Sequence, residues 1–276
     1  MLLKIQDCFS WTLNRFQDTL AKGLLIYADS SNEVELLVSS CKNNIVLKDN
    51  PSKEIIDFAN GAAISGRPVA SLVCANGEYN DIILNILDLA KTLSEPTFKH
   101  INVLIDNDFS TLDVNYIGNL FSTLDYKIYL PSNPYDFCSL LKIALEDANP
   151  NFFLISPDIF EVQGPVPDFE TDPLTKSQSK IRKEANDVSI IATGEDIFQA
   201  CEYADSLPLN AEIIETRVIS PIDYQTLTNS ILKTKNAKII QTNSYLENFN
   251  QDLCSKLQNL CKDAFICIER IECNEN

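Results

Sequence analysis

The sequence predicts an α/β protein with two doubly wound, mostly parallel-sheet domains. Short apolar runs with the length of buried strands alternate with segments whose apolar residues recur at helical spacing. The alternation fails over residues 157–186, where prolines cluster among acidic side chains, and it resumes at residue 188. Strands and helices in this order are typical of a parallel sheet that helices cover on both faces.

The elements of the first domain follow from local patterns. Residues 7–22 have the spacing of an amphipathic helix, and residues 23–29 form an apolar run that ends in a polar turn. Asn50 and Pro51 place a capping residue before a proline at the first helical position, which predicts a helix that runs to Ser65. Further strands are expected at residues 44–48, 69–74, 101–106, 127–130 and 152–155, and further helices at residues 79–93, 114–124 and 136–146.

The second domain repeats the pattern after the linker. An apolar run at residues 188–194 is followed by a helical pattern at residues 197–205. Strands are expected at residues 211–216, 237–242 and 264–270, and helices at residues 224–232 and 250–262.

Composition excludes several classes of function. A formal net charge of −17 argues against a nucleic-acid partner, because such binding depends on Lys and Arg. No apolar run approaches the roughly 20 residues that cross a bilayer, and the N-terminus lacks the pattern of a signal peptide. We therefore expect a soluble, cytoplasmic protein without a membrane partner. Nine cysteines without a C-x-x-C pair and a single histidine argue against disulfide and zinc frameworks.

Several segments together resemble a known family, although none is specific alone. They are the small-residue helix and Gly-Arg-Pro turn at 61–73, the Leu-Pro-Ser-Asn-Pro-Tyr-Asp turn at 130–136, the Asp-Ala-Asn-Pro turn at 147–150, Gly194, and the Arg-x-x-x-Pro-x-Asp segment at 217–223. The chain resembles, over almost its whole length, the β subunit of thiamine-diphosphate-dependent 2-oxo acid (pyruvate) dehydrogenases, within the transketolase group. The resemblance implies a transketolase-like pyrimidine-binding domain at 1–156, a linker at 157–186 and a transketolase C-terminal-like domain at 187–276.

This resemblance also implies a cofactor and partners. In the family, the β subunit contributes the aminopyrimidine half of a thiamine diphosphate site, and a separate α subunit holds the diphosphate and its magnesium. With seven glycines and no Gly-rich phosphate loop, this chain is not equipped to hold a diphosphate alone. We expect an α subunit as partner, a homodimeric contact between β-type chains, a heterotetramer as the assembly, and, in a eukaryote, the mitochondrial matrix or another organelle.

The family's catalytic glutamate stands in a Thr-Pro-x-x-Glu segment, and Glu54 has the same spacing from Pro51. The resemblance therefore implies that Glu54 binds the aminopyrimidine ring and is catalytic. Two alternatives stay open. Counting back from Gly61 instead places Ser52 at this position, and a glutamate in the first turn of a helix is also favoured by the helix dipole alone.

Other cofactor contacts of the family are changed in this sequence. Alignment from the Gly-Arg-Pro turn places Gly77 where the family has its stacking phenylalanine. Tyr79 and Asn80 are the remaining candidates for contacts with the ring, and both could equally be ordinary residues at a helix start. The family's active-site histidine aligns with Leu112 or Asp113, and we expect His100 to lie at the surface.

A second site follows from the turn at 147–150. In some relatives this turn holds a structural monovalent cation, and the resemblance implies that Asp147 and Asn149 supply oxygen ligands to it. A simple turn at the end of a helix explains the same residues without a cation.

Two other functions compete with the dehydrogenase subunit. The altered cofactor contacts favour a degenerate, non-catalytic homologue that acts as an assembly or regulatory subunit. The C-terminal half of a split transketolase fits less well, because its sugar-phosphate substrate calls for His and Arg residues that are scarce in this chain.

Overall fold

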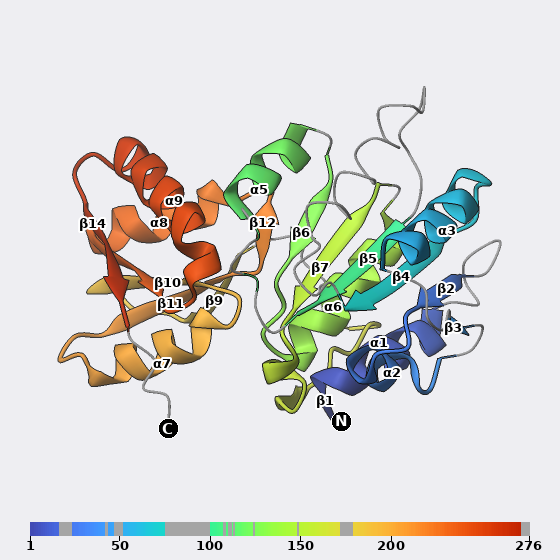
Figure 1. Ribbon diagram of the computed structural model, residues 1–276. Helices are drawn as coiled ribbons and strands as arrows, with labels where there is room; N and C mark the ends of the chain where they lie inside the picture. The colour runs from blue at the N-terminus through green and yellow to red at the C-terminus, as the bar shows by residue number, and fades with distance from the viewer. Residues whose placement is uncertain are drawn as a thin grey trace. The chain divides into compact units, whose positions relative to one another are not determined.

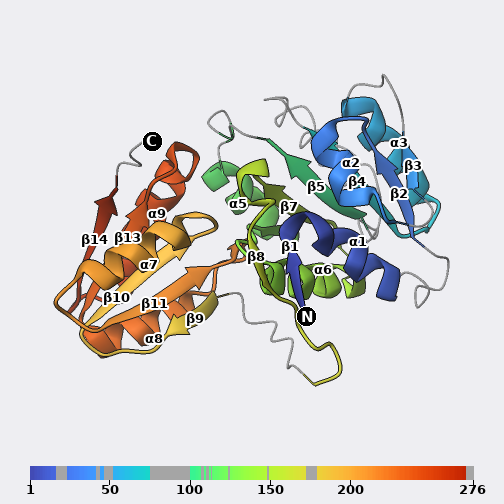
Figure 2. The same cartoon turned by 90° about the horizontal axis from the view of Figure 1, so that it is seen from below.

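The computed structural model describes residues 1–16, 24–41, 44–46, 52–74, 100–106, 109, 112, 114–123, 125–147, 149–171 and 179–271 (Figures 1 and 2). The chain divides into two compact units. Unit 1 comprises Met1–Leu112 and Asp125–Leu174, and unit 2 comprises Asp113–Leu124 and Thr175–Asn276.

Unit 1 is built on a parallel sheet. Its strands are β2 (Leu25–Ala28), β3 (Asn44–Val46), β4 (Val69–Cys74), β5 (His100–Ile105), β6 (Lys127–Tyr129) and β7 (Asn151–Ile155). They lie in the order β6-β7-β5-β4-β2-β3, and each neighbouring pair is parallel. A short antiparallel ribbon joins β1 (Leu2–Lys4) to β8 (Gln163–Pro165).

Helices cover both faces of this sheet. They are α1 (Ile5–Phe16), α2 (Asn32–Val38), α3 (Ser52–Ile64) and α6 (Pro134–Glu146), and a 3₁₀ turn, η2, follows at Pro157–Ile159. Figure 1 shows α3 on one side of β4, and α1 and α2 on the other. Side-chain caps fix two helix starts: Ser31 accepts a hydrogen bond from the backbone of α2, and Asn133 accepts one from the backbone of α6.

Unit 2 has a smaller mixed sheet. Its strands are β9 (Ser179–Lys183), β10 (Val188–Thr193), β11 (Ala211–Thr216), β13 (Asn236–Gln241) and β14 (Phe265–Arg270), in the order β14-β13-β10-β11-β9. All pairs are parallel except the edge pair of β9 with β11. In Figure 1, α7 (Asp196–Ser206) covers one face, and α8 (Tyr224–Thr234) and α9 (Glu247–Leu260) cover the other.

Three shorter pieces complete unit 2. They are α5 (Val114–Thr123), β12 (Val218–Ser220) and the 3₁₀ turn η3 (Ser244–Leu246). Helix α5 therefore packs with unit 2, although it lies between β5 and β6 in the sequence.

The predicted α/β class with mostly parallel sheets is confirmed, and the predicted strands lie within a few residues of the observed ones. Two differences stand out: β9 falls within the segment that we expected to be a linker, and α2 follows a pattern that we did not read as helical. The expected helix at 79–93 and the end of the expected helix at 7–22 lie outside the described residues. In the described part of the chain, every helix is too short or too polar to cross a bilayer.

Candidate functional site

A ligand site is expected at the carboxyl edge of the unit 1 sheet. All its strands are parallel, so they all end at the same edge. From β2 the chain first passes to β3 on one side and then to β4 on the other, so the strand order reverses between β2 and β4. Ligands of open parallel sheets bind outside the carboxyl ends of the strands at such a reversal.

Asp29 joins the two strand ends at this point. One of its oxygens accepts a hydrogen bond from the backbone of Cys74, the last residue of β4, at 2.5 Å. The other accepts bonds from the backbone and the hydroxyl of Ser31, at 2.9 and 2.6 Å. Sequence reasoning missed Asp29, although an aspartate directly after a buried strand was a usable signal.

More oxygen acceptors follow the next strands. Asp106 comes directly after β5 and is 9% exposed. Ser156 follows β7, and its hydroxyl accepts a hydrogen bond from the backbone of Asp158 at 3.2 Å. Arg67 and Lys127, by contrast, stand just before or at the start of their strands and so lie at the opposite edge. Among the described residues, this distribution places the carboxylates of Asp29 and Asp106 at the edge where a ligand is expected.

Glu54 lies in the first turn of α3, and its side chain is exposed. Phe58, Gly61 and Ile64 follow at helical spacing and are also exposed, so they share a face of α3 with Glu54. Phe58 is 53% exposed and Ile64 is 49% exposed. A Cβ atom added at Gly61 would meet no atom within 4 Å. The opposite face of α3 packs on the sheet through Ala59 and Ala63.

The structure describes only part of the predicted cofactor contacts. Tyr79, Asn80 and Gly77 lie outside the described residues. Ser52, the alternative to Glu54, is the first residue of α3. Leu112, one of the two positions aligned with the family's histidine, is 3% exposed and offers no group that could transfer a proton. Asp113, the other position, lies outside the described residues.

Our expectation that His100 lies at the surface is wrong. It is 1% exposed, and its Nε2 lies 3.0 Å from the hydroxyl oxygen of Ser71 on the neighbouring strand β4. That hydroxyl also donates to the amide oxygen of Asn102 at 3.0 Å. Burial lowers the pKa of His100 to about 3, because desolvation disfavours the charged ring. As the first residue of β5, His100 is also at the sheet edge opposite Asp106.

In the turn at 147–150, the ammonium group of Lys127 already pairs with Asp147. The other carboxylate oxygen of Asp147 accepts a hydrogen bond from the backbone of Asn149 at 3.0 Å. The Asn149 amide donates to Asp125 at 2.9 Å. Within the described ranges, no cluster of three or more His, Cys, Asp or Glu residues could hold a metal ion. The monovalent cation at Asp147 and Asn149 stays a prediction.

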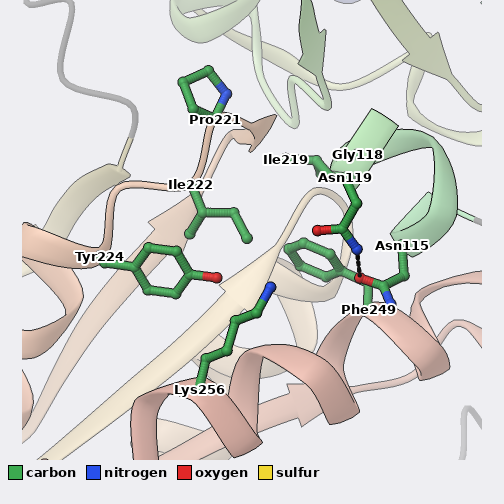
Figure 3. Close-up of a pocket in the computed structure, with 9 residues that line it drawn as sticks. All are labelled: Asn115, Gly118, Asn119, Ile219, Pro221, Ile222, Tyr224, Phe249 and Lys256. Atoms are coloured by element: carbon green, nitrogen blue, oxygen red, sulfur yellow. Dashed lines mark hydrogen bonds between the residues drawn. The ribbon is translucent and has the colours of Figure 1, made fainter. Parts of the chain in front are cut away.

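In unit 2, the segment at 217–223 has a clear structural role. Asp223 caps α8 by accepting a hydrogen bond from the backbone of Thr226 at 3.1 Å, and its second oxygen accepts one from the backbone of Ser179 at 3.4 Å. The peptide bond between Ser220 and Pro221 is cis. Figure 3 shows Pro221 and its neighbours forming part of the wall of a cavity within unit 2.

Comparison with known proteins agrees with this architecture. Residues 177–266 match the family model described as "Transketolase, C-terminal domain". The chain is 38% identical over 118 residues to the acetoin:2,6-dichlorophenolindophenol oxidoreductase subunit beta of Bacillus subtilis (strain 168), covering 41% of this chain and 34% of that protein. It is 31% identical over 119 residues to the pyruvate dehydrogenase E1 component subunit beta of the same organism, covering 42% of this chain and 36% of that protein. The matched stretch thus spans about a third of the length of these relatives.

The whole chain is similar in fold to a solved structure described as "Split gene transketolase, inactive beta4 tetramer". The two share 13% sequence identity and a TM-score of 0.74, over 99% of this chain and 90% of the other. The protein therefore has a transketolase-like fold and carries a transketolase C-terminal domain at 177–266.

Proposed function

We propose that this chain is the β-type subunit of a multichain, thiamine-diphosphate-dependent 2-oxo acid dehydrogenase component, and that it contributes the aminopyrimidine half of a cofactor site shared with an α-type chain. The transketolase C-terminal domain and the similarity to the two Bacillus subtilis β subunits support this class of subunit. The observation that carries the proposal is the exposed face of α3, where Glu54 stands beside apolar side chains.

That face has the composition of a protein interface. Phe58 and Ile64 expose large apolar surfaces, and burying such surface against another chain is favourable by roughly 25 cal/mol per Å². The space around Gly61 allows a backbone to approach closely. A partner that covers this face would also enclose the carboxylate of Glu54 and take it out of water.

The residues of this chain fit one half of the cofactor. A carboxylate such as Glu54 can accept a hydrogen bond from a protonated ring nitrogen. Asp29 and Asp106 at the same sheet edge would repel a diphosphate, which supports a separate chain as the holder of the diphosphate and its magnesium. When bound, thiamine diphosphate supplies the carbanion chemistry of decarboxylation. Glu54 would bind and orient the ring.

The substrate and assembly follow as parts of the same proposal. A subunit of this class would act on pyruvate or a branched 2-oxo acid in a heterotetramer with two kinds of chain. Tyr79 and Asn80 remain the candidates for further contacts with the ring. Asp147 and Asn149 remain the candidates for a structural cation, in competition with Lys127.

Association and cofactor binding test the proposal together. The full chain would be co-expressed with an α-type chain of this dehydrogenase class, and thiamine diphosphate with magnesium would be titrated calorimetrically. Glu54→Gln should weaken cofactor binding at least tenfold and abolish decarboxylation, because the amide is a poorer acceptor and cannot hold a proton in exchange with the ring. Glu35→Gln, which changes an exposed acid on α2, should leave both unchanged.

A second pair of variants tests the interface. Phe58→Ala should weaken binding of the α-type chain about tenfold or more, whereas Leu232→Ala, which removes a 45% exposed side chain from α8, should not. If the complex formed by the Glu54→Gln chain binds the cofactor as tightly as the unmodified complex does, Glu54 does not belong to the site. Equal association of both alanine variants would remove the α3 face from the interface.

Leu112 favours a second candidate, a non-catalytic subunit of the same assembly. A buried leucine cannot act as a general acid or base, and Asp113, the other position aligned with the histidine, lies outside the described residues. In that case the α-type chain would still bind through α3, and Phe58→Ala would still weaken its association. The complex would then have no decarboxylase activity, and Glu54→Gln would leave cofactor binding unchanged.

A further inference from the structure

Unit 2 contains a cavity that the proposed cofactor site does not use. Its volume is about 290 Å³, and three elements of unit 2 form its walls: α5, the segment between β12 and α8, and α9. The lining residues are Asn115, Gly118, Asn119, Ile219, Pro221, Ile222, Tyr224, Phe249 and Lys256 (Figure 3).

One part of the cavity is apolar and firmly held. Ile219 is 2% exposed and Phe249 is 1% exposed, so both are fixed in the core of unit 2. Helix α5 approaches closely through Gly118, where an added Cβ atom would lie 3.0 Å from the Cγ2 atom of Ile219. Gly118 and Ile219 both line the cavity, so this part of its wall is apolar.

Polar groups converge on the same space from other elements. In Figure 3, the ammonium group of Lys256 and the hydroxyl group of Tyr224 point toward the centre of the cavity, and the amide of Asn119 faces them. The Nδ2 atom of Asn119 donates to the Oδ1 atom of Asn115 at 3.3 Å, which orients that amide. An apolar wall with a few convergent polar groups is the usual composition of a small-molecule site.

The charge of Lys256 decides which kind of ligand fits. Its ammonium group lies 2.6 Å from a carboxylate oxygen of Asp252. The hydrogen bond to Asp252 raises the pKa of Lys256, so the group is charged at neutral pH. An ammonium group has three donors; the pair with Asp252 uses one of them, and the hydroxyl group of Tyr224 also interacts with the ammonium. Asp252 also offsets part of the positive charge, so we expect anion binding of moderate rather than high affinity.

We propose that this cavity binds a small organic carboxylate with an apolar body. The carboxylate would accept hydrogen bonds from Lys256 and Tyr224, and the apolar part would pack against Ile219, Ile222 and Phe249. The amide of Asn119 would meet a second polar group on the ligand, such as a hydroxyl or a carbonyl. This site is independent of the proposed dehydrogenase role, because none of its residues belongs to α3 or to the carboxyl edge of the unit 1 sheet.

The test uses 3-methylbutanoate as the probe and its neutral analogue 3-methylbutanamide as the matched control. Each would be titrated into the full-length, ¹⁵N-labelled protein at pH 7 and followed by two-dimensional NMR. We expect saturable shifts in α5 and around Phe249, with a dissociation constant of about 1 to 10 mM for the carboxylate. The amide should bind at least tenfold more weakly, because it lacks the charge that Lys256 recognises.

Two variants and one control assign the site. Lys256→Gln should weaken binding of 3-methylbutanoate about tenfold, and Tyr224→Phe should weaken it about threefold. Lys262→Gln removes an exposed lysine just after α9 and should change nothing. The proposal is overturned if no saturable shift occurs up to about 50 mM, if the amide binds as well as the carboxylate, or if both variants bind as the unmodified protein does. Should Lys256→Gln fail to fold, Tyr224→Phe carries the same comparison.

Discussion

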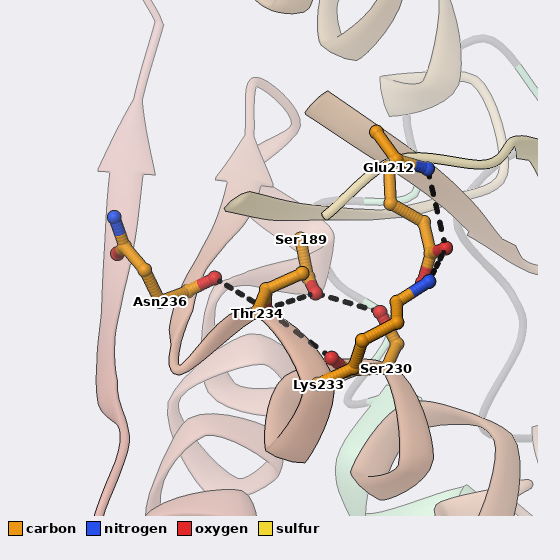
Figure 4. A network of polar contacts seen from close by, with 7 residues as sticks. Ser189, Glu212, Ser230, Lys233, Thr234 and Asn236 are labelled. Atoms are coloured by element: carbon orange, nitrogen blue, oxygen red, sulfur yellow. Dashed lines mark hydrogen bonds and ion pairs between the residues drawn. The ribbon is translucent and has the colours of Figure 1, made fainter. Parts of the chain in front are cut away.

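At the residue scale, both sheets bury polar side chains that are satisfied by other strands or helices. In unit 1, Ser71 links His100 to Asn102 across two strands. In unit 2, the hydroxyl of Ser189 on β10 lies 2.6 Å from that of Ser230 and 2.8 Å from that of Thr234, both on α8 (Figure 4). In both cases a hydrogen-bond partner lowers the cost of burying the hydroxyl group. These groups fix how the elements pack and do not form a catalytic site.

The protonation of His100 gives a direct test. Its pKa is lowered to about 3 by burial, whereas an unfolded histidine titrates near 6.5. The imidazole resonances of His100, the single histidine of the chain, should therefore stay constant from about pH 8 to pH 5 in the native protein. The same resonances should titrate near pH 6.5 in concentrated urea. A native midpoint near pH 6 would contradict the buried position of the ring.

The same shift predicts how stability depends on pH. Below about pH 6.5 the unfolded chain takes up a proton at His100 that the folded chain excludes, so this contribution to stability is present above pH 6.5 and is lost as pH falls toward 3. The loss should approach roughly 1 kcal/mol per pH unit. Asp196 acts in the opposite direction, because desolvation raises its pKa to about 6 and so favours the folded state as pH falls from about 6 to 4.

The misplacement of His100 shows where sequence reasoning stops at this scale. A histidine at the entry to a strand carries no local signal of burial. The ring contacts Ser71, which in turn donates to Asn102. These contacts form because β4 and β5 pair in a register that places Ser71 beside Asn102. That register is a property of the folded sheet. Glu54, by contrast, could be proposed from the resemblance of the segment Pro51 to Glu54 to the family's Thr-Pro-x-x-Glu, because that signal is local in the sequence, and its role stays a prediction.

At the element scale, the strongest sequence signals were strand length and helix caps. The run at 69–74 is observed as β4 with the same bounds, and the pattern at 211–216 as β11. The polar edge strand β9 was missed, because Ile181 is its single apolar residue and the segment around it is rich in prolines and acids. It pairs with β11 through backbone hydrogen bonds, for which the sequence gives little warning.

The turn between α6 and β7 supports a prediction about an ion pair. The side chains of Lys127 and Asp147 are 22% and 14% exposed, so removing the ammonium leaves a partly buried carboxylate without its cation. Lys127→Met should lower the free energy of unfolding by about 1 to 3 kcal/mol. Lys183→Met breaks a pair with Asp205 in which both side chains are exposed, and should cost only about 0.5 kcal/mol or less. Urea denaturation measures both.

Unfolding in two different salts tests whether this turn binds the predicted monovalent cation. The Lys127→Met protein would be unfolded in potassium chloride and in choline chloride at equal ionic strength. If Asp147 and Asn149 hold a cation once the ammonium is gone, potassium should recover part of the lost stability. Equal stability in the two salts would speak against the cation, and equal losses in the two methionine variants would contradict the role of burial.

At the scale of the whole molecule, the chain passes between its two units more than once. Helix α5 is counted with unit 2, yet the strands before and after it, β5 and β6, belong to unit 1. Sequence reasoning placed α5 in the first domain, because a helix between two strands of a parallel sheet usually covers that sheet. Gly118 of α5 instead packs closely against Ile219 of unit 2. The boundary between units is therefore set by tertiary contacts and not by the order of elements.

This arrangement predicts how the molecule opens. Amides of α5 should exchange with deuterium through the same opening as α8 and α9, and separately from α6, when exchange is followed by mass spectrometry in increasing urea. Leu257→Ala removes a fully buried side chain from α9 and should cost about 2 to 5 kcal/mol, so it should speed exchange in α5. Leu141→Ala creates the matched cavity in α6 and should speed exchange there while leaving α5 unchanged. If α5 instead follows Leu141→Ala, its stability comes from unit 1, and the walls of the cavity in unit 2 could open without unfolding that unit.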